Sequence, residues 1–388
     1  MSTATDIYWD PFDIELDAAP YEMWRRMRDE APVYRNDKYD FFAFTRFEDV
    51  ENAHKDPLTY SSAHGITLEI MGEDMARTGM MIFQDPPEHT RLRHLVSRAF
   101  TPRRIADLEP KIRAICAELL DAQEGKASFD YLQDFGAIVP SRVISTLLGV
   151  PREDQEAQRH VIDQLFHIEP GVGMINDVSA TAGMNLIVYL AGLLAEREKH
   201  PQDDMLTALV QADLTHDESA AFAMLLFTAG TETVARLLGN VAVVLADHPD
   251  QRADLAKNPD VIPNAIEELL RFEAPSPVQG RWTHRDVSLH SVDIPKDSKV
   301  LLLTGAAVRD ERVFPDPDRF DVRRKIDHHV SFGYGIHFCV GAALARMEGR
   351  IALEETLKRH PEWAVDHANA KRLHTSTVRG WAEVPILV

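Results

Sequence analysis

The sequence predicts an α-rich α+β protein made of one large domain over residues 1–388. Helical hydrophobic patterns dominate residues 88–250, whereas strand signals gather near the N-terminus and after residue 286. No stretch rich in glycine, serine or proline resembles a linker, and we find no internal repeat. Hydrophobic residues make up 45% of the 388 residues, which is enough for a sizeable core. Helices should therefore form the body of the protein, with a small, segregated β portion.

Turn and helix signals predict the elements of the first half in order. Residues 33–35 and 41–45 flank the pair Asn36-Asp37, so they predict a β-hairpin. A helix should cover residues 88–99 and end before Thr101-Pro102, because proline disfavours a helical conformation in the residue before it. Further patterns predict helices at residues 105–120, 140–148 and 154–166.

The second half follows from the same signals. Proline and glycine break the helical pattern at residues 168–173, and a helix resumes at residues 178–199. Thr215 and Glu218 form a capping box, which opens a long helix reaching about residue 246. The remaining predicted elements are a helix at 261–272, strands at 287–294, 299–304 and 383–388, and a last helix between Cys339 and Pro361.

Charge and cysteine content exclude several classes of function. A net charge of -20 argues against nucleic-acid binding, which needs a basic surface. The two cysteines, Cys116 and Cys339, form neither a disulfide framework nor a zinc-binding pair. No charged-then-apolar leader opens the chain, and its apolar runs are far shorter than a membrane span. We therefore expect a cytoplasmic monomer without a membrane anchor.

The most informative segment runs from Ser331 to Gly341 and contains Cys339. Glycines before the cysteine permit backbone conformations closed to other residues and let another group approach closely. The residues after it are good helix formers, so Cys339 should lie at a helix start, where free amides favour the thiolate. A thiolate is a metal ligand or a nucleophile. The glycines indicate that a large, flat group lies against this loop.

A second unusual segment, Ala229-Gly230-Thr231-Glu232-Thr233, falls inside the long predicted helix. Glycine in a helix costs about 1 kcal/mol relative to alanine, and sequences break such local rules most often at functional sites. The small pair lets another group approach, a threonine hydroxyl can bond to a backbone carbonyl and loosen the helix, and the acid can carry a proton. The alternative is a contact between two helices through small residues.

Together these segments resemble the cytochrome P450 family. The run from Phe332 to Gly341 is similar to the family's haem-binding loop, in which a cysteine thiolate binds the iron. Residues 229–233 are similar to the family's oxygen-activation motif. The motifs occur in the family's order from Asp85 onward, so the resemblance covers essentially the whole chain.

The resemblance implies the cytochrome P450 fold, with haem b between the long central helix and the helix that follows Cys339. Cys339 would be the axial metal ligand. Thr233 would hold dioxygen and a water molecule, and Glu232 would help to relay protons to them. The other implied haem-binding residues, which include donors to the two propionates, are His89, Arg93, Arg281, His337, Phe332, Gly333, Ala229 and Gly230.

Two weaker patterns gain meaning from the resemblance. His89 and Arg93 lie four residues apart on one face of a predicted helix, where two cationic donors suit an anion such as a propionate. Glu268 and Arg271 match the family's Glu-x-x-Arg motif. The resemblance implies that they form a buried structural network with a third residue, Arg319, from a proline-rich segment.

The implied activity is that of a haem-thiolate monooxygenase. It would insert one oxygen atom from O2 into a C–H bond of a small hydrophobic substrate, such as a steroid, fatty acid, terpenoid, polyketide or aromatic compound. Electrons would come from NAD(P)H through a reductase and an iron–sulfur ferredoxin. A basic surface near Cys339 would attract the acidic ferredoxin. Its members would be Arg91, Arg98, Arg103, Arg104, Arg323, Arg324, Lys325 and Arg346.

The implied substrate pocket is apolar and methionine-rich, which suits irregular hydrophobic shapes. Its implied lining comprises residues 65–82 and 165–184, Leu225, Leu226, Ala229, and the pairs 277–278 and 376–377.

Three alternative functions remain open. A peroxide-dependent haem-thiolate enzyme would share the fold, although the intact Glu232-Thr233 pair argues against it. A haem-binding sensor or carrier would hold the same cofactor without turnover. A cysteine hydrolase would use Cys339 with His337, but residues two apart are poorly placed to form a catalytic dyad on a helix.

Overall fold

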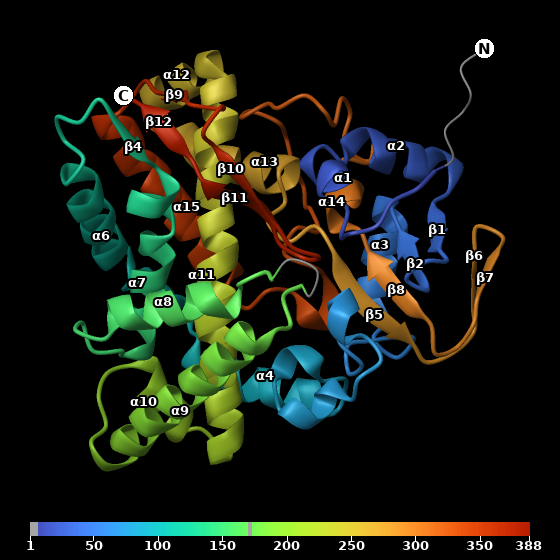
Figure 1. Ribbon diagram of the computed structural model, residues 1–388. Helices are drawn as coiled ribbons and strands as arrows, with labels where there is room; N and C mark the ends of the chain where they lie inside the picture. The colour runs from blue at the N-terminus through green and yellow to red at the C-terminus, as the bar shows by residue number, and fades with distance from the viewer. Residues whose placement is uncertain (1–6, 170–172) are drawn as a thin grey trace.

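The computed structural model describes residues 7–169 and 173–388. Most helices gather on one side of the molecule, and the largest sheet lies on the other (Figure 1). The expected α-rich architecture with a segregated β portion is confirmed. The predicted helix break at 168–173 falls partly on residues 170–172, which lie outside the described residues.

Fifteen α-helices are described, and the long helix α11 runs through the middle of the helical side (Figure 1). They are α1 Ile14–Ala18, α2 Tyr21–Glu30, α3 Phe47–Lys55, α4 Glu88–Ala99, α5 Pro102–Ala106, α6 Glu109–Asp121, α7 Ile138–Leu148, α8 Gln155–Leu165, α9 Asp177–Lys199, α10 Met205–Val210, α11 His216–Asp247, α12 Pro249–Lys257, α13 Ile262–Phe272, α14 Thr304–Ala307 and α15 Ala342–Arg359.

Twelve short strands form the β portion of the described chain. They are β1 Val33–Asn36, β2 Phe41–Phe44, β3 Tyr60–Ser61, β4 Ser128–Asp130, β5 Gln279–Thr283, β6 Val287–Leu289, β7 Val292–Ile294, β8 Lys299–Leu302, β9 Ala364–Val365, β10 Lys371–His374, β11 Arg379–Glu383 and β12 Pro385–Leu387.

The largest sheet has the strand order β1-β2-β8-β5-β3, in which only β2 and β8 are parallel. The predicted hairpin at its edge is confirmed as β1 and β2. A three-stranded sheet, β4-β12-β9, joins residues 128–130 to the end of the chain. The sheets therefore connect parts of the chain that are far apart in sequence.

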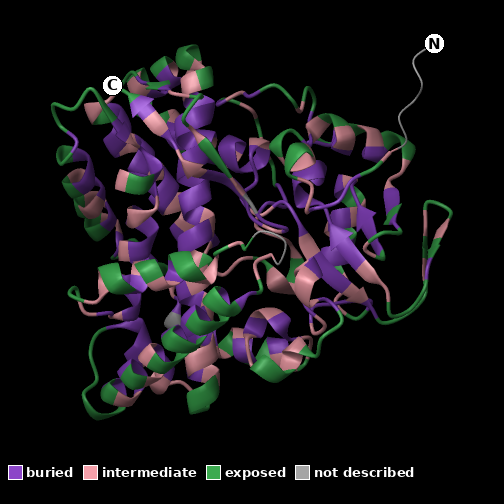
Figure 2. Ribbon diagram, viewed as in Figure 1, coloured by how far each residue is buried: buried purple, intermediate pink, exposed green. Residues whose placement is uncertain are grey.

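The capping box that predicts the long helix is present at the start of α11. The Thr215 hydroxyl accepts a hydrogen bond from the Glu218 backbone N–H, and the Glu218 carboxylate accepts one from the Thr215 N–H. This satisfies two amide groups that a helix start otherwise leaves free. The helix then continues for 32 residues, mostly buried (Figure 2).

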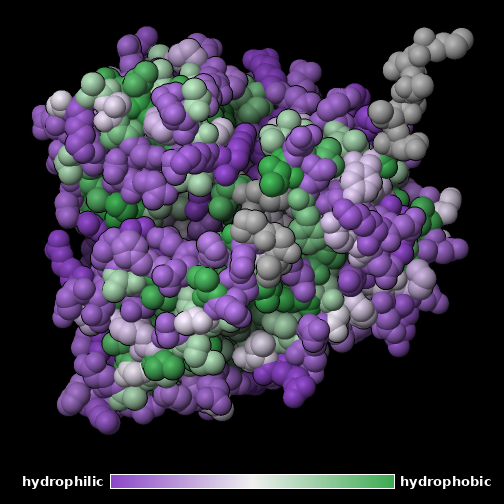
Figure 3. Space-filling view, viewed as in Figure 1, coloured by the Kyte–Doolittle hydropathy of each residue, from purple (hydrophilic) through white to green (hydrophobic). Residues whose placement is uncertain are grey.

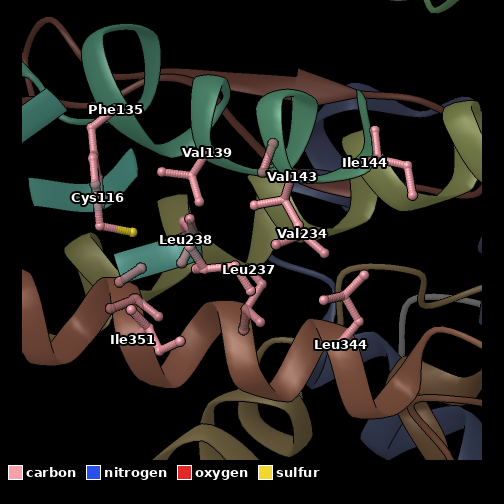
Figure 4. Packing of buried hydrophobic residues seen from close by; sticks show 14 of the residues in the cluster. Cys116, Phe135, Val139, Val143, Ile144, Val234, Leu237, Leu238, Leu344 and Ile351 are labelled. Atoms are coloured by element: carbon pink, nitrogen blue, oxygen red, sulfur yellow. The ribbon is translucent and has the colours of Figure 1, made fainter. Parts of the chain in front are cut away.

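Helix α11 lies between α7 and α15 in the hydrophobic core. Figure 4 shows its residues Val234, Leu237 and Leu238 between the two neighbouring helices. The labelled side chains on those helices are Val139, Val143 and Ile144 from α7 and Leu344 and Ile351 from α15. This packing fixes the middle of α11 opposite the start of α15.

Three expected elements are divided in the structure, and the strand expected at 383–388 is the last residue of β11 followed by β12. The single helix expected at 105–120 is divided into α5 and α6, and Pro110 lies in the first turn of α6, where proline is tolerated. The strand expected at 287–294 is a hairpin, β6–β7, which turns at His290 and Ser291 with φ angles of 49° and 63°. It projects from the edge of the molecule (Figure 1).

Among the described residues, α9 and α11 are long and apolar enough to cross a membrane. In α11, 67% of the most apolar stretch is buried inside the protein, as expected for a core helix, whereas in α9 the share is 39%.

Candidate active site

A cavity lies between the middle of α11 and the start of α15. Its other walls come from α4, β5 and the segment that precedes α15. Almost all of the residues predicted from the sequence meet at this one cavity. They are Cys339, Thr233, His89, Arg93, Arg281, His337, Phe332, Gly333, Ala229 and Gly230.

The loop before α15 turns Cys339 toward the cavity. The Cys339 backbone N–H donates to the carbonyl oxygen of Phe332 at 2.9 Å, which closes the loop. Gly335 has a φ of 66°, and a Cβ atom there would lie 2.4 Å from the backbone oxygen of His54. The loop therefore needs glycine at this position because both its conformation and its contact with α3 exclude a side chain.

Burial and the helix start act in opposite directions on Cys339. Burial raises the pKa of the thiol, while backbone N–H groups of Gly341 and Ala342 and the charge of Arg93 lower it. Burial is the largest of these effects. The helix start therefore favours the thiolate, as expected from the sequence, while burial opposes it.

The unusual segment of α11 faces the cavity with its small residues. The Thr233 hydroxyl donates to the carbonyl oxygen of Ala229 at 2.9 Å, and both residues line the cavity. A Cβ atom at Gly230 would lie 3.1 Å from Ile144 of α7. Gly230 thus serves the close contact between α7 and α11 as well as the cavity, so the helix-packing interpretation holds for this residue.

Glu232 lies beside the cavity and is absent from its lining. Its carboxylate is buried and pairs with Arg236, with Nε and Oε1 3.0 Å apart. Arg236 also donates to the carbonyl oxygen of Trp381. The acid is therefore held by an ion pair on the side of α11 that faces β11.

Two arginines reach the cavity without a carboxylate partner. Arg281 is buried, and its guanidinium contacts the carbonyl oxygen of Gly280 at 2.7 Å and Nδ1 of His54 at 3.3 Å. Burial lowers the pKa of Arg281 to about 10 and also lowers the pKa of Arg93. Within the part of the chain that the structure describes, neither arginine forms an ion pair.

Two histidines add unpartnered polar atoms to the same wall. The rings of His89 and His337 lie 4.3 Å apart between centroids. Both ring nitrogens of His89 and Nε2 of His337 are buried and have no hydrogen-bond partner among the described residues. Burial lowers the pKa of His89 to about 4 and that of His337 to about 2, so both are neutral at pH 7. Buried donors rarely stay unpaired, so this wall suits an anionic ligand.

Among the cavity residues that were not identified from the sequence, two are titratable. His54 is buried in α3, its Nε2 has no partner in the described chain, and burial holds its pKa well below the ordinary value. Glu348 is buried in α15 with Oε2 unpartnered, and burial raises its pKa well above the ordinary value. Neither residue belongs to a recognisable sequence motif. Each is buried at the cavity only because of tertiary packing.

The predicted structural network is present with a different third member. Glu268 and Arg271 are fully buried and paired, with Nε and Oε2 2.7 Å apart. Arg324 supplies the third side chain, 3.2 Å from Glu268. The prediction of Arg319 is wrong, because that residue is 71% exposed and its ion pair is with Asp321.

Four of the eight residues of the basic surface expected near Cys339 are paired with acidic neighbours, and no ion pair of Arg103, Arg104 or Lys325 is found among the described residues. Arg91, Arg323 and Arg346 are paired with Glu88, Asp254 and Glu267, respectively. Arg324 belongs to the buried network described above. The side chain of Arg98 lies outside the described residues.

The apolar part of the cavity is smaller than the lining expected from the sequence. From the first expected loop, Ile66, Met81 and Ile82 reach it, together with Leu225 and Leu226 of α11. None of the described residues in the expected ranges 165–169, 173–184 and 376–377 lines it, and residues 275, 276 and 279 take the place expected for 277 and 278.

Comparisons with known proteins agree on one family. The cytochrome P450 family model matches residues 25–380. Cytochrome P450 123 of Mycobacterium tuberculosis is 39% identical over 391 residues, covering 99% of this chain and 97% of that protein. Vitamin D(3) 25-hydroxylase of Pseudonocardia autotrophica is 37% identical, covering 95% and 93%. The open structure of cytochrome P450 EryK from S. erythraea is similar with a TM-score of 0.89 and 34% identity, covering 96% of each chain.

Proposed function

The chain belongs to the cytochrome P450 family and is a haem-thiolate monooxygenase, and we propose that it oxidises a C–H bond of a small hydrophobic molecule. One observation supports this proposal most strongly. A single cavity is bounded by Cys339, by Ala229 and Thr233 of α11, and by a wall that combines two arginines without an ion pair among the described residues and histidines with unpartnered ring nitrogens.

The residues around the cavity fit haem b. Cys339 would ligate the iron, whose positive charge would favour the thiolate against the effect of burial. Haem carries two propionates, and Arg281, Arg93 and the unpartnered nitrogens of His89 and His337 would hold them. When bound, haem supplies dioxygen activation, and the thiolate ligand favours O–O cleavage.

In this proposal, Thr233 and Glu232 deliver protons to the cavity. Thr233 hydrogen-bonds to its own helix through Ala229, and its hydroxyl can turn to hold a water molecule at the cavity. Glu232 reaches the cavity only when its ion pair with Arg236 opens. Proton delivery is therefore linked to the opening of that pair on the far side of α11.

The substrate is bound mainly through apolar contacts. Its side of the cavity is formed by Ile66, Met81, Leu225, Leu226 and similar residues. The amide of Gln279 is already engaged by Ser276 and Thr304, which leaves few polar groups free to anchor a ligand. A compact hydrophobic molecule such as a steroid, fatty acid, terpenoid, polyketide or aromatic compound suits this lining, as the name of the vitamin D(3) 25-hydroxylase relative suggests.

Electrons reach the protein in the cytoplasm from NAD(P)H through a reductase and an iron–sulfur ferredoxin. This part of the proposal rests on family membership, since the paired arginines near Cys339 give only a weak positive surface.

An optical titration of the purified ferric holoenzyme tests the substrate proposal. A panel of steroids, fatty acids, terpenoids, polyketides and aromatic acids is added, and a ligand that displaces water from the iron changes its spin state. We expect a saturable change with one class, and conversion of that compound in the presence of NADH, reductase and ferredoxin. Loss of product per NADH in Thr233→Ala would support the role of Thr233.

Two results would contradict the proposal. Turnover with hydrogen peroxide alone, at the same rate as with the full electron-transfer chain, would indicate a peroxide-dependent enzyme. Haem binding without conversion of any compound that changes the spin state would indicate a sensor or carrier. Cys339→Ser serves as the control, because it should remove the thiolate spectrum while leaving the fold intact.

A further inference from the structure

The outer face of α9 is apolar and exposed, and no described segment covers it. Val188 is 65% exposed and Met184 is 62% exposed, and Val178 and Ile187 are exposed beside them. Exposed and buried residues alternate along this helix in Figure 2, and hydrophobic side chains reach the surface in its region in Figure 3. Large apolar side chains that gather on a surface mark a site of association.

One line of seven residues along the outer face of α9, which we call the stripe, has a regular composition. Its residues follow one another at spacings of four and three, so they lie within about 40° of a single line along the helix. The two end residues carry opposite charges, and the five between them are uncharged. The members of this stripe are Asp177, Thr181, Met184, Val188, Gly192, Ala195 and Lys199.

No close contact with the described residues of the chain requires glycine at position 192. It lies within the helix, it is exposed, and a Cβ atom there would meet nothing within 4 Å. Glycine at such a position costs about 1 kcal/mol relative to alanine. A locally unfavourable residue without a reason inside the chain indicates a contact outside it, and a small residue lets a second helix approach closely.

The stripe is complementary to itself when one copy is turned by a two-fold axis at Val188. Val188 then faces Val188, and bulky Met184 faces Gly192, which has no side chain. In the same register Asp177 faces Lys199, so each end of the stripe pairs a carboxylate with an ammonium group. A two-fold interface requires such reciprocity, because residue i contacts residue j and j contacts i.

We propose that α9 is a homodimer interface, in which two copies pack antiparallel through this stripe with Val188 on the two-fold axis. The monomer expected from the sequence then forms only on dilution. A helix of 23 residues is about 34 Å long, so the contact is smaller than a standard protein interface and should be reversible. The interface is separate from the cavity and does not rest on the substrate proposal.

Other occupants fit the face less well. A membrane surface favours helices whose apolar face is flanked by several cationic residues. Here the stripe itself contains Asp177, the exposed residues Glu196 and Glu198 lie on the same helix beside it, and the chain carries a net charge of -20. An unrelated protein would not require the stripe to be symmetric about Val188.

Sedimentation velocity of the holoenzyme over a range of concentrations tests the association. The wild-type protein should shift from monomer to dimer as concentration rises, whereas Val188→Glu, which places two carboxylates at the axis, should remain monomeric. Leu58→Glu is the matched control, because it adds the same charge at another apolar side chain that is 72% exposed. Equal haem content and an unchanged thiolate spectrum would show that each variant is folded.

Cysteine cross-linking tests the register. Under added oxidant, Val188→Cys alone should form a disulfide-linked dimer, since two thiols meet at the axis. Thr181→Cys alone should not, because its two copies lie about 21 Å apart along the helix pair. The double variant Thr181→Cys with Ala195→Cys should cross-link again. Cys116 is buried, and the unmodified protein gives the background.

Three outcomes would overturn the proposal. The first is a monomer at every concentration. The second is cross-linking of Thr181→Cys as rapid as that of Val188→Cys, which would indicate random encounters. The third is a monomeric protein that binds phospholipid vesicles and loses this binding in Val188→Glu, which would assign the face to a membrane surface.

Discussion

At the scale of single residues, two glycines before Cys339 share a backbone conformation but differ in the space around them. Gly333 and Gly335 have φ angles of 68° and 66°. A Cβ atom at Gly335 would collide with the backbone oxygen of His54, whereas at Gly333 the nearest atom lies at an ordinary distance of 3.7 Å. The same substitution should therefore have different consequences at the two positions.

We expect Gly335→Ala to destabilise the holoenzyme by about 2 kcal/mol or more and to reduce haem retention, because strain and a backbone collision add. Gly333→Ala should cost about 1 kcal/mol, which is the strain alone. Thermal unfolding and haem content of the two purified variants check this order. Equal losses would mean that the contact with α3 does not constrain the loop.

Glu348 allows a prediction of pH dependence. Burial raises its pKa well above the ordinary value of 4.5. Between these two values the folded protein holds a proton that the unfolded chain has released. The stability contributed by this group is therefore complete below pH 4.5 and declines as pH rises toward the raised pKa.

Glu348→Gln removes this titration, so the variant should become more stable relative to wild type as pH rises from 5 to 8. The gain should not exceed about 1.4 kcal/mol per pH unit, which is the limit for one proton. Thermal unfolding of the holoenzyme at several pH values measures it. Glu124→Gln, at an exposed position, should show no such trend. A difference from wild type that is constant with pH would contradict the assignment.

At the scale of elements, the buried network joins α13 to the segment before the Cys339 loop. Arg324 reaches Glu268 and also donates to the carbonyl oxygens of Pro315, Asp316 and Arg319. It therefore holds a turn that has no regular secondary structure. Without Arg324, Glu268 keeps Arg271 as its cationic partner but loses its second one, and the turn loses the donor to its carbonyl oxygens.

Arg324→Ala should destabilise the protein by about 3 kcal/mol, because Glu268 loses a partner and three carbonyl groups lose a donor. Arg319→Ala should change the stability by no more than about 0.5 kcal/mol, as is usual for an exposed side chain. Chemical or thermal unfolding of the two variants compares them directly. A larger loss of stability in Arg319→Ala would mean that Arg319, as predicted from the sequence, is the third member of the network.

A helix or strand could be predicted from the sequence where its signal lies within a few neighbouring residues. Helix α4 was predicted with its observed bounds, and prolines stand just beyond both ends of it. Strand β5 was missed because Gly280 interrupts its pattern. A Cβ atom there would lie 2.9 Å from the backbone of Ile66, so the glycine serves a close approach rather than a turn.

The same distinction applies to the site. Cys339 and Thr233 lie in segments whose glycines and small residues are locally unfavourable for regular structure. Both residues could therefore be predicted from the sequence. His54 and Glu348 have ordinary helical neighbours, and only the fold buries them at the cavity. The choice between Arg319 and Arg324 depended on the path of an irregular segment, which no periodicity encodes.

At the scale of the whole molecule, the two ends of the chain are joined to distant parts of the sequence. Arg379 of β11 donates to the carbonyl oxygen of Asp17 and pairs with Glu273. Strand β12 lies between β4 and β9, and Ile386 pairs with both Phe129 and Val365. Because these contacts join segments that are far apart in the described chain, they favour the single domain expected from the sequence.

This interleaving predicts that residues 1–388 unfold as one unit, and the last strand provides the test. Deleting residues 385–388 removes β12, the fully buried Ile386 and the ladders to β4 and β9. We expect calorimetry of the holoenzyme to show one transition, moved to lower temperature by a loss of about 3 kcal/mol or more. Deleting Val388 alone, which is partly exposed, should have little effect. If the truncated protein instead shows a second, low-temperature transition while the main one stays in place, the C-terminal sheet unfolds independently and the single-domain prediction fails.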